Sequence, residues 1–111
     1  MLKDNIAFPD FVKLDLRIGT IKTAAMVVGS DRLIKLEVDL GEEIGTRQII
    51  AGIGKHYKAE ELVGRQVVVV VNLESKKMMN LESSGMILAA GDEEIALLTL
   101  DKKLPNGSLV R

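Results

Sequence analysis

Apolar and polar residues alternate most regularly between residues 34 and 40. Isoleucine, leucine and valine occupy every second position there and are separated by charged residues, which is the period-two pattern of a strand with one buried face. A second alternating stretch continues past residue 21 and places Leu14, Leu16 and Ile18 on one face, with Gly19 available for a bend. Further apolar stretches predict strands at residues 46–51, 66–71 and 86–90, and a last apolar run covers residues 95–100.

Two short helical elements are predicted outside the strands. Residues 59–62 are expected to make about one helical turn between the third and fourth strands, before Gly64 ends it. Pro9 predicts a helical or turn entry near the N-terminus, since proline fits the first turn of a helix, and we expect this entry to pack as a lid. Residues 72–85 are polar and predict a loop between the fourth and fifth strands.

The order of these elements is that of an OB-fold. Five strands, with a short helix between the third and fourth, form a Greek-key barrel in that fold, and it binds ligands through the face of strands two and three and through two loops. We therefore predict an all-β protein with one domain over residues 1–111 and added terminal elements. Its two binding loops would be residues 26–32 and 72–85.

The composition limits the kind of site that this barrel can carry. The chain has 111 residues, 47% of them hydrophobic, which suffices for one compact core and is too short for two ordinary domains. Aromatic residues make up only 3%, so we expect an aliphatic core and no site built on stacked rings. The absence of cysteine excludes disulfides, thiolate zinc sites and cysteine nucleophiles, and it favours a reducing compartment.

The N-terminal segment does not have the pattern of a signal peptide, which is a basic start followed by a continuous apolar stretch. Fully apolar runs, such as residues 67–71, are far shorter than the ~18 residues that span a bilayer. We therefore expect a cytoplasmic protein with no membrane partner.

Positive charge gathers in the middle of the chain. The net charge is −1, so there is no global basic surface of the kind that most nucleic-acid-binding domains show. Residues 44–80 nevertheless carry a net charge of +3, and the segments on either side each carry −2. Arg32 lies in the first predicted binding loop, and Lys76 and Lys77 lie in the second. Basic residues therefore occur where an OB-fold would use them.

No combination of residues predicts catalysis, and we expect neither a cofactor nor a metal ion. Gly52 and Gly54 follow a strand, as in dinucleotide-binding loops, but Tyr57 replaces the third glycine and no long helix follows. His56 is the only histidine, and a lone histidine is more often a surface residue than a metal ligand. The segment Ser83-Ser84-Gly85 lacks the leading glycine of a nucleophile elbow. The sequence predicts a binding protein and not an enzyme.

Several segments of the chain together carry a family signature. They are Asp31-Arg32-Leu33, Leu36-Glu37-Val38-Asp39-Leu40-Gly41, Tyr57 with Glu60-Glu61-Leu62, Asn72-Leu73-Glu74-x-Lys76-Lys77, and Ser83-x-Gly85-Met86-x-Leu88. Their order and spacing closely resemble the tRNA-binding OB-fold domain family. This family includes the C-terminal domain of methionyl-tRNA synthetase, the separate archaeal β-subunit form of that domain, and stand-alone dimeric tRNA-binding proteins.

The resemblance implies a homodimer that recognises tRNA mainly by shape and backbone. Such a protein assists aminoacylation by a partner methionyl-tRNA synthetase in trans, without doing chemistry itself. By position, the resemblance carries over Arg32 from the first loop, and Asn72, Lys76, Lys77 and Ser83 from the second loop and the strand that follows it. We add Arg47, Lys55 and Lys58 as RNA-binding candidates because of their charge.

The chain departs from the family at both binding loops. The family's first loop usually carries a His-Pro pair where this chain has Val27-Val28, and its second loop usually has a proline where this chain has Ser75. The family's Arg-Gly pair is replaced by Met79 and Asn80. Losing a basic residue at position 79 weakens the expected phosphate site, so we expect an effect on affinity more than on fold.

A second family shares the expected fold and dimer form. Two segments, Asp10-Phe11-x-Lys13-Leu14-Asp15-x-Arg17-x-Gly19-Thr20-Ile21 and Glu43-Ile44-Gly45, also look like the CsaA-type secretion chaperones, in which an apolar groove would bind peptides. Met78, Met79 and Leu81 suit such a groove, since methionine-bearing surfaces adapt to varied partners. Alternatively, these three residues anchor the loop or the dimer. A structural part that dimerises a synthetase is a third alternative.

Overall fold

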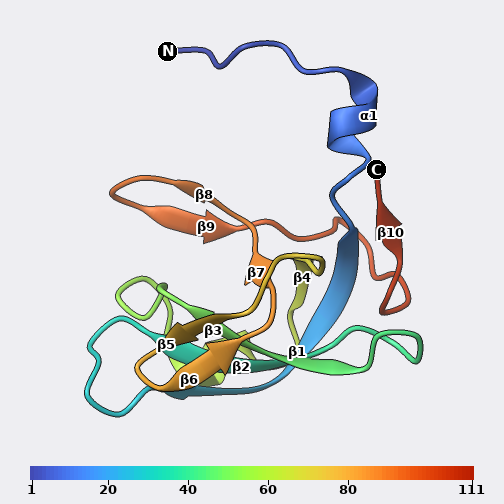
Figure 1. The fold of residues 1–111 in the computed structure, drawn as a ribbon. Helices are drawn as coiled ribbons and strands as arrows, with labels where there is room; N and C mark the ends of the chain where they lie inside the picture. The colour runs from blue at the N-terminus through green and yellow to red at the C-terminus, as the bar shows by residue number, and fades with distance from the viewer.

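Six antiparallel strands form the main sheet in the computed structural model, which describes residues 1–111, and five of them follow one another in a continuous path (Figure 1). These five are β1 (Leu16–Met26), β2 (Ile34–Asp39), β3 (Thr46–Ala51), β4 (Gln66–Val70) and β7 (Met86–Ile87), in the spatial order β3-β2-β1-β4-β7. β7 also contacts β3, so the sheet curls into a nearly closed barrel. The helix α2 (Ala59–Leu62) connects β3 to β4 and buries Leu62. The predicted all-β OB-fold is confirmed.

The alternating residues of β2 explain its place inside the sheet. Ile34, Leu36 and Val38 are completely buried, while the charged residues between them are half-buried or exposed. β2 pairs with β1 on one side and with β3 on the other. A slip of one residue would turn the buried residues toward solvent, so the register of β2 is strongly specified.

The sheet buries apolar residues on both of its faces. An inner cluster of 13 buried residues fills the barrel. A separate outer cluster consists of Leu16, Ile18, Val68 and Val70, and it is covered by Leu88, Leu100 and Val110. β1 and β4 contribute to both sides because successive side chains of a strand point in opposite directions. The predicted apolar face of the first strand is therefore an outer face, and its Leu14 is exposed.

Gly19 brings β1 and β2 close together inside the barrel. A Cβ atom added at Gly19 would lie 2.5 Å from Cγ1 of Val38 and 3.0 Å from the carbonyl oxygen of Asp39. Glycine is therefore needed here for close packing, in addition to the bend that the sequence suggests.

The largest difference from the predicted fold is in residues 72–85. The prediction of a loop is wrong, because β5 (Lys76–Met78) and β6 (Leu81–Ser83) form a two-stranded hairpin. Met79 and Asn80 make its two-residue turn with φ angles of 52° and 64°, the positive values that match the twist of a tight hairpin. Asparagine tolerates this conformation, whereas methionine adopts it only at an energetic cost. The sequence pattern did not predict the hairpin because most of its strand residues are polar.

A second small hairpin replaces the predicted continuous strand at residues 86–90. The chain leaves the main sheet after Ile87, and β8 (Ala89–Gly91) then pairs only with β9 (Ile95–Leu97). The β8–β9 hairpin projects from the barrel (Figure 1). In the last apolar run, residues 95–100, only Ile95–Leu97 form a strand.

The N-terminal helix does not cover the barrel. α1 (Phe8–Phe11) stands away from the main sheet (Figure 1), and none of its residues is buried. The predicted lid is therefore wrong: the terminal elements cover only the outer face of β1 and β4, and α1 lies beyond them. No helix in the structure is both long and apolar enough to cross a membrane.

The C-terminal tail is held against the start of β1. β10 (Leu109–Val110), which the sequence pattern does not predict, pairs with the first two residues of β1. Arg17 donates hydrogen bonds to the carboxylates of Asp15 and Glu43 and to the carbonyl of Gly107. The hydrogen bonds to Asp15 and then to Glu43 raise the pKa of Arg17. Because arginine is protonated at any usual pH, the guanidinium keeps the positive charge that these hydrogen bonds use.

Candidate nucleic-acid interface

Three segments that are far apart in the sequence meet at one end of the barrel. They are the loop between β1 and β2, the connection between β3 and α2, and the β5–β6 hairpin. Gly54 donates its backbone N–H to the carbonyl of Arg32 at 2.7 Å, which joins the first two segments. The methyl end of Met79 lies against Gly29, where an added Cβ atom would be 3.4 Å away. The hairpin tip therefore touches the first loop.

The guanidinium of Arg32 has no partner within the chain at this end of the barrel. The side chain is exposed and makes no ion pair or hydrogen bond within the chain. The guanidinium lies over Gly52, where an added Cβ atom would be 2.7 Å from Nη1. Gly52 therefore leaves room for an arginine side chain. A free guanidinium suits two parallel hydrogen bonds to a phosphate.

Lys55 and Lys58 come from the second segment. Lys55 lies 3.6 Å from a carboxylate oxygen of Asp31, and the two side chains are 63% and 83% exposed, so this ion pair contributes little. Lys58 precedes α2 and donates its backbone N–H to the carboxylate of Glu61 at 3.0 Å, which leaves its exposed ammonium group free. Both lysines are accessible to an anion.

Lys76 and Lys77 point to opposite faces of the hairpin. Lys76 lies opposite Ser83 and Lys77 lies opposite Glu82, and successive side chains of a strand alternate between faces. Lys76 therefore faces the barrel, and Lys77 faces outward beside Glu82. The two neighbouring lysines cannot act as one patch.

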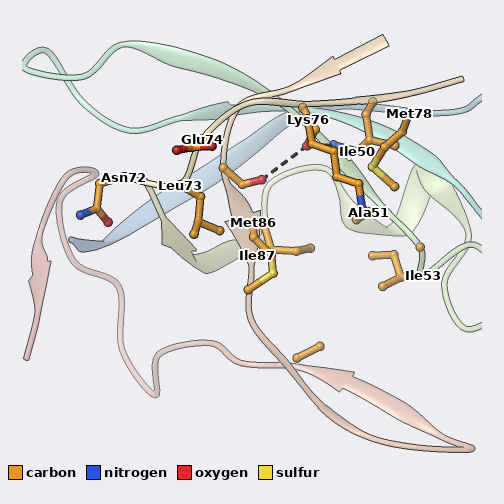
Figure 2. Close-up of a pocket in the computed structure, with 14 residues that line it drawn as sticks. Ile50, Ala51, Ile53, Asn72, Leu73, Glu74, Lys76, Met78, Met86 and Ile87 are labelled. Atoms are coloured by element: carbon orange, nitrogen blue, oxygen red, sulfur yellow. Dashed lines mark hydrogen bonds between the residues drawn. The ribbon is translucent and has the colours of Figure 1, made fainter. Parts of the chain in front are cut away.

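An apolar groove of about 710 Å³ lies between the hairpin, the end of β3 and β7 (Figure 2). Ile53, Leu73, Met78 and Met86 are among its apolar lining residues, and Lys76 lies above it with Glu74 nearby (Figure 2). Lys76 and Glu74 thus place one charge of each sign at the edge of a mostly apolar hollow.

Two predicted contact residues serve the protein's own structure. The side-chain amide of Asn72 accepts the N–H of Asp15 at 2.8 Å and donates to the carbonyl of Lys13 at 2.6 Å, which anchors the start of β1. The hydroxyl of Ser83 accepts the N–H of Ile50 at 2.9 Å, and Ser83 is only 5% exposed. We therefore leave Asn72 and Ser83 out of the proposed contact surface.

Arg47 also makes hydrogen bonds within the protein. Its Nη1 donates to the carbonyl of Val71 at 3.0 Å and to that of Ser84 at 3.4 Å. Gln48, which no sequence pattern singles out, donates from its side-chain amide to the carbonyl of Glu82 at 2.9 Å. No sequence signal identifies these roles, because they depend on where the hairpin lies relative to β3.

Tyr57 and His56 are two further polar residues of this end. The hydroxyl of Tyr57 accepts the N–H of Leu97 at 3.0 Å, and its ring lies 5.3 Å from the guanidinium of Arg65, so this member of the family signature supports β9. His56 is exposed. No group of three or more His, Cys, Asp or Glu residues is arranged to hold a metal ion.

An OB-fold barrel with cations from three segments at one end defines a class of protein, the nucleic-acid-binding OB-fold domains. Comparison with known families specifies the class further. The family model described as "Putative tRNA binding domain" matches residues 16–109. The chain belongs to this tRNA-binding domain family, as the sequence resemblance indicates.

The chain is similar to one part of each of two longer relatives. The chain is 53% identical over 110 residues to a methionine–tRNA ligase of Methanothrix thermoacetophila, which covers 98% of this chain and 16% of that protein. It is 49% identical over 108 residues to a methionine–tRNA ligase of Caldanaerobacter subterraneus, with 96% and 17% covered. The chain therefore spans about a sixth of the length of these relatives.

Two solved structures are similar over nearly their whole length. A MetRS-related protein of Pyrococcus horikoshii has a TM-score of 0.91 and 32% identity, with 98% of this chain and 100% of that chain covered. The chaperone CsaA of Bacillus anthracis has a TM-score of 0.88 and 37% identity, with 97% and 100% covered. The fold is thus shared by a synthetase-related protein and by a chaperone.

Proposed function

We propose that the chain binds tRNA through the cations at one end of its barrel and performs no chemistry. The observation that carries this proposal is the convergence of three segments, whose exposed and largely uncommitted cations are Arg32, Lys55, Lys58, Lys76 and Lys77. Phosphate groups are their natural ligands. Family membership supports tRNA as the nucleic acid.

Recognition by shape and backbone agrees with the chemistry of this end. Phenylalanine, tyrosine and tryptophan make up 3% of the chain, and the hydroxyl of Tyr57 is engaged with Leu97, so large stacking rings contribute little there. Charge-based contacts that are spread over three segments can instead follow the backbone of a folded RNA.

The test is a binding titration with labelled tRNA at two salt concentrations. We expect binding at low salt that weakens as salt rises, with a slope of about −0.7 to −0.9 in log K against log salt for each phosphate contact. Folded tRNAs should compete well, and an unstructured homopolymer RNA should compete poorly. The absence of binding at low salt would contradict the proposal.

We further propose that the chain assists a methionyl-tRNA synthetase in trans and works in the cytoplasm. The similarity to part of two methionine–tRNA ligases supports this partner. Adding the chain to a synthetase catalytic chain that lacks such a domain should lower the KM for tRNA and leave kcat unchanged, since the added domain contributes binding only. An unchanged KM would contradict the assistance in trans and would leave tRNA binding intact.

A homodimer is proposed because α1 and its surroundings expose apolar side chains. Phe8, Val12 and Leu14 are exposed, and so is Leu109 on β10, which lies near α1 (Figure 1). A second copy would remove these residues from water. It would also join two modest cationic surfaces, so that avidity compensates for the low net charge of each copy.

The double variant Phe8→Asp/Val12→Asp is expected to turn this dimer into a monomer, because the interface would have to bury two carboxylates. Analytical ultracentrifugation would measure the change from twice the chain mass of 12.1 kDa to that mass. Val63→Asp is the control, since Val63 is 52% exposed and Val12 is 56% exposed. A monomeric wild-type chain, or a double variant that stays dimeric, would overturn this assignment.

Met79→Arg is expected to increase tRNA affinity several-fold. Met79 is exposed at the hairpin tip beside the first loop, so a cation there adds about one phosphate contact and steepens the salt slope by about 0.7–0.9. Leu2→Arg adds the same charge on the exposed N-terminal segment and serves as the control. An equal gain in both variants would show that only the net charge matters.

Peptide binding is a second candidate function, and the apolar groove favours it. Met78 and Met86 line the groove, and a chaperone shares the fold. Met78 also packs under the hairpin, together with Leu81, against the cluster of Val27, Leu33 and Ile50. Met79 is exposed at the tip.

Light scattering of an aggregating unfolded client would test this second function. Peptide binding requires the chain to suppress aggregation, and Met78→Ser/Met86→Ser should abolish the suppression, whereas Lys76→Ala should retain it. Unchanged aggregation in the presence of the wild-type chain would exclude this function.

A further inference from the structure

The β5–β6 hairpin is attached to the barrel mainly through side chains. It forms a two-stranded sheet of its own and shares no ladder with the main sheet. One backbone hydrogen bond, from Ser84 N–H to the carbonyl of Gln48 at 2.8 Å, links its base to β3. The other polar links from β3 use the side chains of Arg47, Gln48 and Ser83. The position of the hairpin therefore depends on a few side-chain hydrogen bonds.

Arg47 connects the two ends of the segment that carries the hairpin. The carbonyl of Val71 precedes the hairpin and that of Ser84 follows it, and one guanidinium nitrogen donates to both, at 3.0 Å and 3.4 Å. Arg47 is half-buried and has no carboxylate partner. Its charge is therefore directed to the protein backbone, where hydrogen bonds from a charged donor are stronger than neutral ones.

Gln48 holds the outer part of the hairpin in the same way. Its side-chain amide donates to the carbonyl of Glu82 on β6 at 2.9 Å, in the middle of the strand that faces Lys76 and Lys77. Beneath the hairpin, Met78 and Leu81 pack on a small apolar cluster. β3 thus contacts the base, the middle and the underside of the hairpin.

We propose that Arg47 is a positioning residue for RNA binding and that Gln48 supports it. Both residues hold the hairpin so that Lys76 stays at the edge of the groove, whose lining also includes Gly52 beneath Arg32. This inference rests on the proposed tRNA-binding function, and it differs from the prediction from charge alone, in which Arg47 itself contacts RNA. A hairpin that is held in place loses less conformational freedom on binding, so the same lysines bind more tightly.

The test combines two single variants with double-mutant cycles, measured by tRNA titration. Arg47→Met removes the donors and keeps a long side chain, and we expect roughly fivefold weaker binding. Gln48→Ala removes no charge, and we expect a smaller loss in the same direction. In the Lys76→Ala/Lys77→Ala background, Arg47→Met should cost almost nothing, because the hairpin no longer carries the contacts. In the Arg32→Ala background, Arg47→Met should weaken tRNA binding by the same factor as in the wild type.

Hydrogen exchange of backbone amides supplies the structural readout. In Arg47→Met and Gln48→Ala, the amides of β5 and β6 should exchange faster, while those that pair β1 with β4 should be unchanged. The β1–β4 ladder also serves as the folding control for both variants. Should Arg47→Met unfold the chain, Gln48→Ala still decides the matter, because it leaves every charge in place.

Three results would overturn the inference. The first is an equal loss of tRNA affinity on Arg47→Met in the Lys76→Ala/Lys77→Ala and Arg32→Ala backgrounds, which indicates direct RNA contact. The second is unchanged exchange of the hairpin amides in both variants. The third is Gln48→Ala binding tRNA as tightly as the wild type. Failure of the proposed function gives a different result, since the wild-type chain would then not bind tRNA although its hairpin exchange still responds to Arg47→Met.

Discussion

The triple variant Arg32→Ala/Lys76→Ala/Lys77→Ala is expected to bind tRNA about 100-fold more weakly than the wild type at low salt. Each exposed cation contributes on the order of 1 kcal/mol, and the three substitutions together correspond to about two orders of magnitude in affinity. The cations come from two segments that meet only in the folded barrel. The measurement is a tRNA titration over a range of salt, in which the slope should also fall by about 0.7–0.9 for each phosphate-binding cation that the variant removes.

The control for this variant removes the same charge elsewhere. Lys102 and Lys103 are exposed next to Leu104, which is hydrogen-bonded to Gln66 at the other end of β4 from the hairpin, and Lys3 is exposed on the N-terminal segment. Replacing these three residues by alanine should change tRNA affinity only slightly. An equal loss of affinity in both triple variants would mean that the overall field of the protein, and not this end of the barrel, determines binding.

The two lysines of the hairpin should also differ from each other. Lys76 faces the barrel and the groove, whereas Lys77 faces outward beside Glu82, so a tRNA lying across the first loop and the groove would contact Lys76 more closely. Lys76→Ala is then expected to account for more of the loss of affinity than Lys77→Ala. This ordering cannot be obtained from the sequence, in which the two residues are adjacent.

Leu36→Ala is expected to lower the free energy of unfolding by about 3 kcal/mol. Leu36 is completely buried on β2, in the inner cluster between β1 and β3. Its truncation removes apolar burial and leaves a cavity among strands that cannot collapse into it freely. Urea denaturation followed by far-ultraviolet circular dichroism would measure the destabilisation.

Leu2→Ala is the matched control, since it is the same substitution at an exposed position. It should leave the unfolding midpoint within error of the wild type. Comparable destabilisation in both variants would contradict the central place of β2 in the core. A small effect for Leu36→Ala alone would mean that the sheet repacks around the missing atoms.

Much of the barrel could be predicted from local patterns. β3 and α2 have the predicted bounds, and β2 differs from its prediction by one residue, because period-two alternation and glycine breaks are properties of consecutive residues. The structure differs from the prediction where a segment depends on a partner distant in sequence. The hairpin at residues 76–83 has mostly polar strand residues, and β8 and β10 are short strands whose existence depends on their pairing.

The candidate site was predicted only in part for the same reason. Exposed cations such as Arg32, Lys55 and Lys58 are recognisable from charge and loop position. Asn72, Ser83 and Arg47 have the right residue types for RNA contact, but their polar groups are engaged with backbone atoms distant in sequence. Hydrogen-bonding capacity is visible in a sequence, whereas the partner that satisfies it is not.

By itself, the sequence determined the OB-fold, the family and the order of the four longest strands along the chain, since these follow from residue identity, spacing and alternation. Only the tertiary structure decided which face of β1 lies inside the barrel. It also decided that Lys76 and Lys77 lie on opposite faces of the hairpin and that Arg47 donates hydrogen bonds to the carbonyls at the two ends of the hairpin segment. The reason is geometric. A strand presents two faces with equal spacing, and its role is set by the segments that close around it.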